Sequence, residues 1–295
     1  DAFPPDLQSL HAFFTDPVTA GSPFDAQPHL ASGAHIARVV SEVNQTEQLI
    51  EEGSAGRSLL ASMENISHFI SGSFISPNFL VDKDGLAAEG CATPLPPHGN
   101  RSPATKDCEV PHDDDENFVV DRHSGEMVVG EGRVTFWCAI PQARFKRPGD
   151  AAFPVSIYGH GYGSTRFEML GFAGFHARFG IATCSTDVFG HGLAIPPALL
   201  GVLNRITEDV HAEGLLAALT DGRARDLNND GEKDSGGDYW TADTFHTRDV
   251  VRQSVVDWMH FIRLLRSFDG QRQMSVSILK PDGSEGHLDG LAGDF

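Results

Sequence analysis

The sequence predicts an α/β fold built on a mostly parallel sheet, and three segments carry this prediction. The run FPVSIYGHG, a helix over about 166–179 and the run GIATCSTD form a strand, a helix and a second strand. This is a βαβ unit, whose right-handed crossover makes the two strands parallel. The runs FVVD, EMVVG and RVTFWCAIP predict a strand meander over about 118–140. Residues 246–268 form the clearest amphipathic helix, because apolar residues recur at spacings of four and three: Val251, Val255, Trp258, Ile262 and Leu265.

The sequence divides into an N-terminal helical and loop extension, 1–117, and an α/β domain, 118–295. Residues 1–30 are rich in proline and turn formers and are expected to form an extended arm over a core. Residues 33–70 carry apolar residues at helical spacing, interrupted by one break. Residues 72–117 are loop-like and end in the acidic run HDDDEN, which is either a solvated segment or a contributor to cation binding.

Composition and charge limit the classes of partner. The chain has 295 residues, 40% of them hydrophobic, which is enough to bury a sizeable core. Asp and Glu outnumber Lys and Arg by 41 to 22, giving a net charge of −19. This charge repels nucleic acid and anionic lipid headgroups and attracts cations. No run approaches the roughly 18 apolar residues of a transmembrane segment. The N-terminus has no basic and then apolar leader, so a targeting segment is expected to have been removed or never present.

The four cysteines, Cys91, Cys108, Cys138 and Cys184, have neither paired CxxC spacing nor a surrounding histidine cluster, which argues against structural zinc. Disulfides are expected instead. A Cys91–Cys108 bridge would restrain a proline-rich polar stretch. Cys138 and Cys184 lie in strand-like runs, where they form a bridge if the strands are neighbours or remain buried free thiols. Disulfides and an acidic surface together favour an exported protein, which is secreted, periplasmic or on the cell surface.

Two glycine-rich turns follow the strands of the βαβ unit. The first strand runs into the HGYG loop, residues 160–163, whose glycines let backbone N–H groups face a negative oxygen at the strand end. The second strand runs into the sequence DVFGHG, residues 187–192, here called the GHG turn. With these two turns the sequence resembles the α/β-hydrolase superfamily over roughly residues 130–270. The resemblance implies that the chain carries the first half of an α/β-hydrolase-like domain.

The resemblance also implies roles for individual residues. In the family an HG-containing loop supplies one of two oxyanion-hole amides, and here that donor would be the backbone N–H of Tyr162. Gly161 and His160 would shape the loop, and His191 would shape the second turn rather than act as a catalytic base. The plainer alternative is that both histidines are turn residues of an ordinary α/β fold, hydrogen-bonded to backbone and without a catalytic role.

The family's nucleophile is not found in these residues. The family places a serine on a G-x-S-x-G elbow directly after the helix that Arg248, Asp249 and Gln253 resemble here. Residues 269–295 contain no such elbow. In the family's sheet the VSIY strand would lie beside the absent nucleophile strand, so one apolar edge would be bare, and natural proteins pair or cover such edges. A second polypeptide, or a missing C-terminal fragment, is therefore expected to complete the sheet and supply the Ser-Asp-His triad.

A metal site is predicted in the polar run DLNNDGEKDSGGD, where side-chain oxygens at alternate positions before a glycine suit a hard cation such as Ca2+. The expected ligands are Asp226, Asn228, Asp230, Glu232, Asp234 and Asp238. A glycine occupies the position where an EF-hand needs a bidentate glutamate, so the run resembles the shorter calcium loops of dockerins and thrombospondin type 3 repeats. It lies in an insertion over about 193–244, where hydrolases commonly carry a cap, and the calcium would be structural.

Together these features predict a serine hydrolase of carboxylic esters or related acyl compounds, of the esterase or lipase kind, that acts through a serine acyl-enzyme. A peptidase or a dienelactone-type hydrolase stays open, because fold alone does not set the substrate. The alternative from another class is a catalytically silent, calcium-stabilised binding protein on a degenerate hydrolase scaffold.

Overall fold

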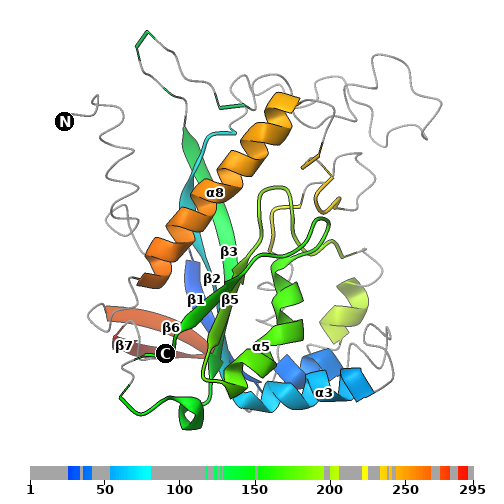
Figure 1. Ribbon diagram of the computed structural model, residues 1–295, viewed down its shortest axis with the longest axis vertical. Coiled ribbons are helices and arrows are strands. Elements are labelled where there is room, and N and C mark those ends of the chain that lie inside the picture. The colour runs from blue at the N-terminus through cyan, green and yellow to red at the C-terminus, as the bar shows by residue number, and fades with distance from the viewer. Residues whose placement is uncertain are drawn as a thin grey trace.

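The computed structural model describes a mixed α/β protein organised around one sheet (Figure 1). The described residues are 26–33, 36–41, 54–80, 117–118, 123–124, 127, 129–149, 152–195, 200–205, 221–224, 233–237, 239–240, 244–266, 273–279 and 285–291. None of the helices in these ranges combines the length and the apolar composition needed to cross a bilayer.

Seven strands form the sheet, in the order β4-β5-β3-β2-β1-β6-β7. In chain order they are β1 (Ala26–Ser32), β2 (Ile66–Asn78), β3 (Gly130–Pro141), β4 (Val155–Tyr158), β5 (Ala182–Thr186), β6 (Gln273–Leu279) and β7 (Glu285–Leu291). Within the described sheet, only β4–β5 and β1–β6 are parallel, and the other neighbours are antiparallel. The prediction of a mostly parallel sheet is therefore wrong. The long strands β2 and β3 pair as antiparallel neighbours and leave the βαβ unit at one end of the sheet.

The predicted βαβ unit is confirmed at that end. β4 and β5 are parallel neighbours, and their connection contains the 3-10 helix η4 (Arg166–Met169) and the helix α5 (Leu170–Arg178). The helical segment begins at Thr165, whose side chain accepts a hydrogen bond from the Phe167 N–H. It ends before Gly180, which has a φ of 70° and whose Cβ, if present, would lie 2.3 Å from a carbonyl oxygen. Only glycine fits that turn.

The segment that forms β2 corrects the sequence-based expectation of helix through residue 70. Helical structure is present at 36–41 and in α3 (Ser54–Ser62), but the chain changes to an extended conformation at Ile66. From there it pairs with β3 along its whole length. The hydrogen bonds of a long partner strand, together with burial on both faces, override the local helical spacing. β1 begins in the segment expected to be an extended arm over the core, but it is a strand inside the sheet that pairs with both β2 and β6.

Helices cover both faces of the central strands. Successive residues of a strand point to opposite faces, so Phe69 and Trp137 pack in the cluster that contains α5 residues. Ile70 and Phe136 pack in the cluster that contains Phe261 of α8 (Thr244–Arg266). In Figure 1, α8 runs along β2 and β3. The result is a layer of sheet between two layers of helix.

The helix expected over 246–268 is confirmed as α8, but it buries a different face from its most apolar one. Residues with fully or nearly fully buried side chains are His246, Asp249, Val250, Gln253, Ser254, Asp257, His260, Phe261 and Leu264. The exposed apolar residues of α8 are Val251, Val255, Met259 and Ile262, with 36% to 54% of each accessible. Most of the apolar stripe that identifies the helix in the sequence is thus left on the outside, and polar side chains fill much of the inside.

A disulfide joins Cys138 of β3 to Cys184 of β5, two residues that face each other across antiparallel strands. This confirms the bridge that the sequence allowed for neighbouring strands. Both side chains lie in the hydrophobic cluster under α8. The other expected pair, Cys91 and Cys108, lies outside the described residues.

Candidate functional site

The HGYG loop begins where β4 ends, and its backbone is tightly turned. The Ser164 N–H donates to the carbonyl oxygen of Gly161 at 3.1 Å, and Gly163 has a φ of 71°. A Cβ on Gly159, directly before the loop, would lie 3.4 Å from the ring of Trp258 on α8. The loop is therefore held at the end strand of the sheet with α8 packed closely beside it.

His160 links the HGYG loop to the GHG turn. Its Nδ1 lies 2.9 Å from the carbonyl oxygen of Gly161, and its Nε2 lies 3.1 Å from the backbone nitrogen of Val188. Because the Val188 N–H is the donor, Nε2 is the acceptor and the ring proton is on Nδ1. Both nitrogens are thus used in holding the backbone, and this geometry is that of a residue that shapes the loop.

Tyr162 lies at the tip of the loop. Its side chain is 62% exposed, and its ring centroid is 5.9 Å from that of His191. Within the described part of the chain, no acceptor takes a hydrogen bond from the backbone N–H of Tyr162. A fixed N–H without an internal acceptor has the property that an oxyanion donor requires.

Glu168 of η4 also holds the HGYG loop, and the sequence analysis did not predict this role. Its Oε2 accepts a hydrogen bond from the Gly161 N–H at 2.9 Å. Burial, and then the charge and hydrogen bonding of Glu168, raise the pKa of Tyr158, the last residue of β4. Only the position of Glu168 in the sequence could have indicated this role. A carboxylate in the first turn of the helix that follows the loop lies close to the N–H groups of the loop.

The GHG turn begins at Asp187, whose side chain is completely buried against Arg166, also completely buried. One carboxylate oxygen accepts the Arg166 backbone N–H at 2.7 Å, and the other pairs with the guanidinium. Arg166 also donates to the carbonyl oxygen of Asp221 at 2.5 Å. The first residue of the GHG turn therefore fixes the start of η4, directly after the HGYG loop.

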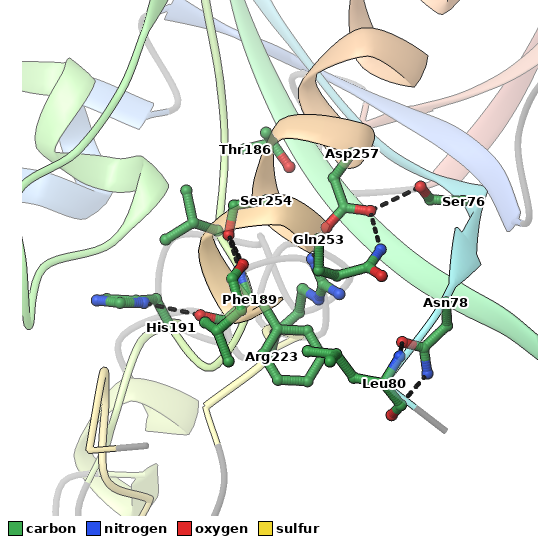
Figure 2. Close-up of polar contacts among 12 residues, drawn as sticks. Ser76, Asn78, Leu80, Thr186, Phe189, His191, Arg223, Gln253, Ser254 and Asp257 are labelled. Carbon is green, nitrogen blue, oxygen red and sulfur yellow. Dashed lines mark hydrogen bonds and ion pairs between the residues drawn. The ribbon is translucent and has the colours of Figure 1, made fainter. Parts of the chain in front are cut away.

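His191, near the end of this turn, contacts the backbone of Phe189, as Figure 2 shows, and two neighbouring rings. Its Nδ1 lies 3.0 Å from the carbonyl oxygen of Phe189, and the Phe189 N–H donates to the Ser254 hydroxyl of α8 at 3.4 Å. Its ring lies 5.0 Å from the ring of His160 and 5.0 Å from the ring of Tyr239. The two glycine-rich turns that the sequence singles out are thus in direct contact.

A buried polar cluster joins α8 to the end of β2 and to the insertion (Figure 2). Asp257 accepts hydrogen bonds from the Ser76 hydroxyl at 2.6 Å and from the Gln253 amide at 2.9 Å. It also forms a salt bridge with Arg223 at 2.5 Å. Gln253 in addition donates to a carbonyl oxygen and accepts an N–H at the end of β2. Every charge in this cluster is compensated, as burial requires.

Asp249, one turn before Gln253, accepts hydrogen bonds from Arg248, from Arg252 and from the Phe118 N–H. Burial alone would raise the pKa of Asp249, but hydrogen bonds from Arg248 and from the Phe118 N–H, with the charges of Arg248 and Arg252, together lower it. The side chain is therefore ionised and anchors residue 118 to α8. Arg248, Asp249 and Gln253, which the sequence linked to the family's pre-nucleophile helix, all fix α8 in place.

A loss of stability in mild acid is expected from His260 of α8. Its side chain is fully buried, and burial, followed by the positive charge of Arg263, lowers its pKa to about 4. The unfolded chain binds the proton near pH 6.5. Between pH 6.5 and 4 the unfolded state therefore holds a proton that the folded state does not, and the free energy of unfolding falls by up to about 3 kcal/mol.

Urea unfolding between pH 4 and 8 measures this loss. The variant His260→Gln should flatten the profile between pH 6.5 and 4, whatever its stability at pH 8. The exposed residue His123 provides the control, and His123→Gln should leave the profile unchanged. Identical profiles for His260→Gln and the parent protein would show that His260 does not cause the effect.

The predicted calcium ligands are almost all outside the described residues. Asp226, Asn228, Asp230, Glu232 and Asp238 are not described, and Asp234 is half-buried. The carbonyl oxygen of Asp234 accepts the Gly237 N–H at 3.2 Å. In the parts of the chain that are described, no group of three His, Cys, Asp or Glu residues is arranged to hold a metal ion.

The described site therefore consists of two contacting turns, a buried ion pair beneath them and a polar attachment to α8. Comparison of the chain with protein-family models, curated proteins and solved structures finds no match.

Proposed function

We propose that this chain is the oxyanion-binding part of a serine hydrolase of carboxylic esters or related acyl compounds, related to the α/β-hydrolases. The observation that carries the proposal is the Tyr162 N–H. It lies at the end of a strand in a loop fixed by His160, and the described residues provide it with no acceptor. Such a donor stabilises the negative oxygen that develops when a nucleophile attacks an ester carbonyl.

The position of β4 supports the part of the proposal that assigns the nucleophile to another segment. β4 is the end strand of the sheet, with β5 as its inner neighbour. Its first residue, Val155, is 49% exposed. A further strand paired with the free side of β4 would bring its carboxyl end next to the HGYG loop if it ran parallel to β4. A serine at that end would face the Tyr162 N–H.

The exposed face of α8 supports the proposal that another segment binds at this end of the sheet. Its exposed apolar residues Val251, Val255, Met259 and Ile262 form a stripe, and Trp258 of the same helix packs against Gly159 at the end of β4. Trp258 therefore links the stripe-bearing helix to the edge of β4, which pairs with no other described strand than β5. We propose that the partner, a second polypeptide or a C-terminal continuation of this chain, covers both and brings the Ser-Asp-His triad.

In the proposed reaction this chain contributes binding and orientation, and the partner contributes the nucleophile and the proton transfers. As the serine oxygen bonds to the carbonyl carbon, charge moves to the carbonyl oxygen, and the Tyr162 N–H donates to it. His160 keeps its proton on Nδ1 and holds the loop, because both of its ring nitrogens are engaged. The buried ion pair between Arg166 and Asp187 fixes the position of the HGYG loop relative to the GHG turn.

Two further features belong to the proposal. A calcium ion bound by the run 226–238 would cross-link the insertion and would have a structural role, because carboxylate and amide oxygens suit this ion. The disulfide between Cys138 and Cys184 fits an oxidising compartment, so we place the protein outside the cytosol. The acidic chain, with a net charge of −19, is suited to an uncharged ester substrate rather than a polyanion.

Labelling with a fluorophosphonate probe tests the proposal. Native protein that contains this chain should give one labelled band on a denaturing gel, either a longer form of the chain or a polypeptide that copurifies with it. Tyr162→Pro removes the N–H and should slow labelling by about a hundredfold or more. Tyr162→Phe keeps the N–H and should label at the parent rate. If no polypeptide in the native material is labelled, the hydrolase proposal is wrong.

One observation favours the second candidate, a catalytically silent binding protein. The Glu168 carboxylate accepts the Gly161 N–H, so a negative charge lies one residue from the proposed oxyanion donor. A negative charge there opposes an oxyanion. Glu168→Gln separates the two candidates, because it should speed labelling of a hydrolase and change nothing in a silent protein.

A further inference from the structure

The segment Ser235–Gly236 lies between the two glycine-rich turns and contacts both. The Ser235 hydroxyl donates to the carbonyl oxygen of Ser164, directly after the HGYG loop, at 3.2 Å. The Ser235 hydroxyl oxygen also accepts a hydrogen bond from the N–H of Gly192, in the GHG turn, at 3.3 Å. The Gly236 N–H donates to the carbonyl oxygen of Gly190 at 2.8 Å. Three hydrogen bonds from two residues therefore span both turns.

Gly236 is a position where a side chain is excluded for two independent reasons. Its φ is 76°, a conformation that favours glycine. A Cβ on Gly236 would also lie 2.6 Å from the Nε2 atom of His191. The backbone of the segment thus packs directly on the His191 ring, which also lies beside the ring of His160.

The insertion also contacts the GHG turn through the Tyr239 ring, which lies against His191, and through Arg223. The Arg223 N–H donates to the carbonyl oxygen of His191 at 2.9 Å, and a Cβ on Gly192 would lie 2.9 Å from the same nitrogen. Arg223 is in turn paired with Asp257 of α8. On this second side the turn is held to α8 through Arg223, whereas the Ser235 hydroxyl contacts both the turn and the residue directly after the HGYG loop.

We propose that Ser235 and Gly236 are positioning residues that clamp the HGYG loop to the GHG turn, so that docking of the insertion sets the direction of the Tyr162 N–H. The inference rests on the proposed function for its catalytic consequence. Its structural part, that the insertion controls the mobility of the loop, stands independently. Ser235 does not touch a substrate in this role and acts through the backbone of the loop.

Hydrogen–deuterium exchange of the full chain tests the structural part. Ser235→Ala removes two hydrogen bonds and should speed exchange in peptides covering 159–165 and 188–192 by about tenfold. Exchange in β2 and β3 should not change. Ser235→Thr keeps the hydroxyl and should restore the parent rates. The control Ser58→Ala, on the exposed surface of α3, should have no effect. Unchanged exchange in the two turns, or equal acceleration in β2 and β3, would overturn the clamp.

Two glycine variants separate the clash from backbone strain. Gly236→Ala places a methyl group against His191 and should speed exchange in the two turns at least as much as Ser235→Ala. Gly149 also has a positive φ, 89°, but its Cβ would meet no atom within 4 Å. Gly149→Ala should therefore leave both turns unchanged. Equal effects of the two variants on the turns would count against the clamp.

Labelling of the complete native protein tests the catalytic consequence. Ser235→Ala should lower the maximal rate of fluorophosphonate labelling about tenfold and leave the half-saturating probe concentration unchanged, because orientation rather than binding is lost. A faster exchange in the turns without any labelling in the parent protein would keep the clamp and reject the hydrolase. Labelling of the parent that Ser235→Ala does not slow would reject the role of the clamp in catalysis.

Discussion

Replacing Asp187 by asparagine is expected to lower the free energy of unfolding by about 3–5 kcal/mol. Both Asp187 and Arg166 are completely buried, and each carboxylate oxygen meets a donor of Arg166. Asparagine has nearly the same shape, but it removes the charge that compensates the guanidinium. An unpaired buried charge costs far more than the pair itself contributes. Urea unfolding monitored by far-UV circular dichroism measures the change.

An exposed ion pair of the same chemistry provides the control. Arg133 and Asp221 form a 2.8 Å salt bridge, but their side chains are 45% and 35% accessible. Asp221→Asn should therefore cost no more than about 1 kcal/mol. The double variant Arg166→Met, Asp187→Leu removes both buried charges and should recover much of the loss. If Asp187→Asn is as mild as Asp221→Asn, the buried pair does not hold the two turns.

Removing the disulfide between β3 and β5 is expected to lower the free energy of unfolding by about 4 kcal/mol. The bridge closes a chain segment of 46 residues, and restraining a loop of this length in the unfolded state gives about that value. The variant that carries both Cys138→Ala and Cys184→Ala also loses two buried sulfur atoms from the cluster under α8. Thermal and urea unfolding under non-reducing conditions measure the effect.

A reducing agent distinguishes this bridge from any contribution of Cys91 and Cys108. Added to the parent protein, the reductant breaks the bridge but leaves both sulfur atoms in place, so the loss due to this bridge should not exceed the loss seen in the double variant. Added to the double variant, it reports only on the remaining two cysteines. A double variant as stable as the parent protein would contradict a stabilising role for the bridge between β3 and β5.

The sequence predicted the parts of the fold that local patterns determine. The βαβ unit is bounded by glycines and by a capping threonine, and both the strands and the helix lie where they were expected. β2 was missed because its apolar residues have a spacing compatible with a helix, and only pairing with β3 makes it a strand. The parallel character of the sheet was overestimated for the same reason. Strand neighbours far apart in the chain leave no local signal.

The candidate site shows the same division. The HGYG loop and the GHG turn are recognisable from their glycines, and the structure brings them into contact through His160 and His191. The residues that hold them, among them Arg166 and Ser235, have no motif, because their role depends on partners distant in sequence. The sequence also did not predict that α8 buries its polar face. Apolar periodicity identifies a helix, but it does not show which face of the helix packs against the sheet.

The pairing of β1 has a consequence for how the protein is made. β1 lies between β2 and β6, and its partner in β6, at residues 277–278, is nearly 250 positions further along the chain. Contacts of such long sequence separation form late, because a large loop must close before they stabilise anything. The ribosome must therefore synthesise almost all of these residues before β1 finds both neighbours. Until then the backbone groups on one side of β1 lack their β6 partner and can pair with other chains.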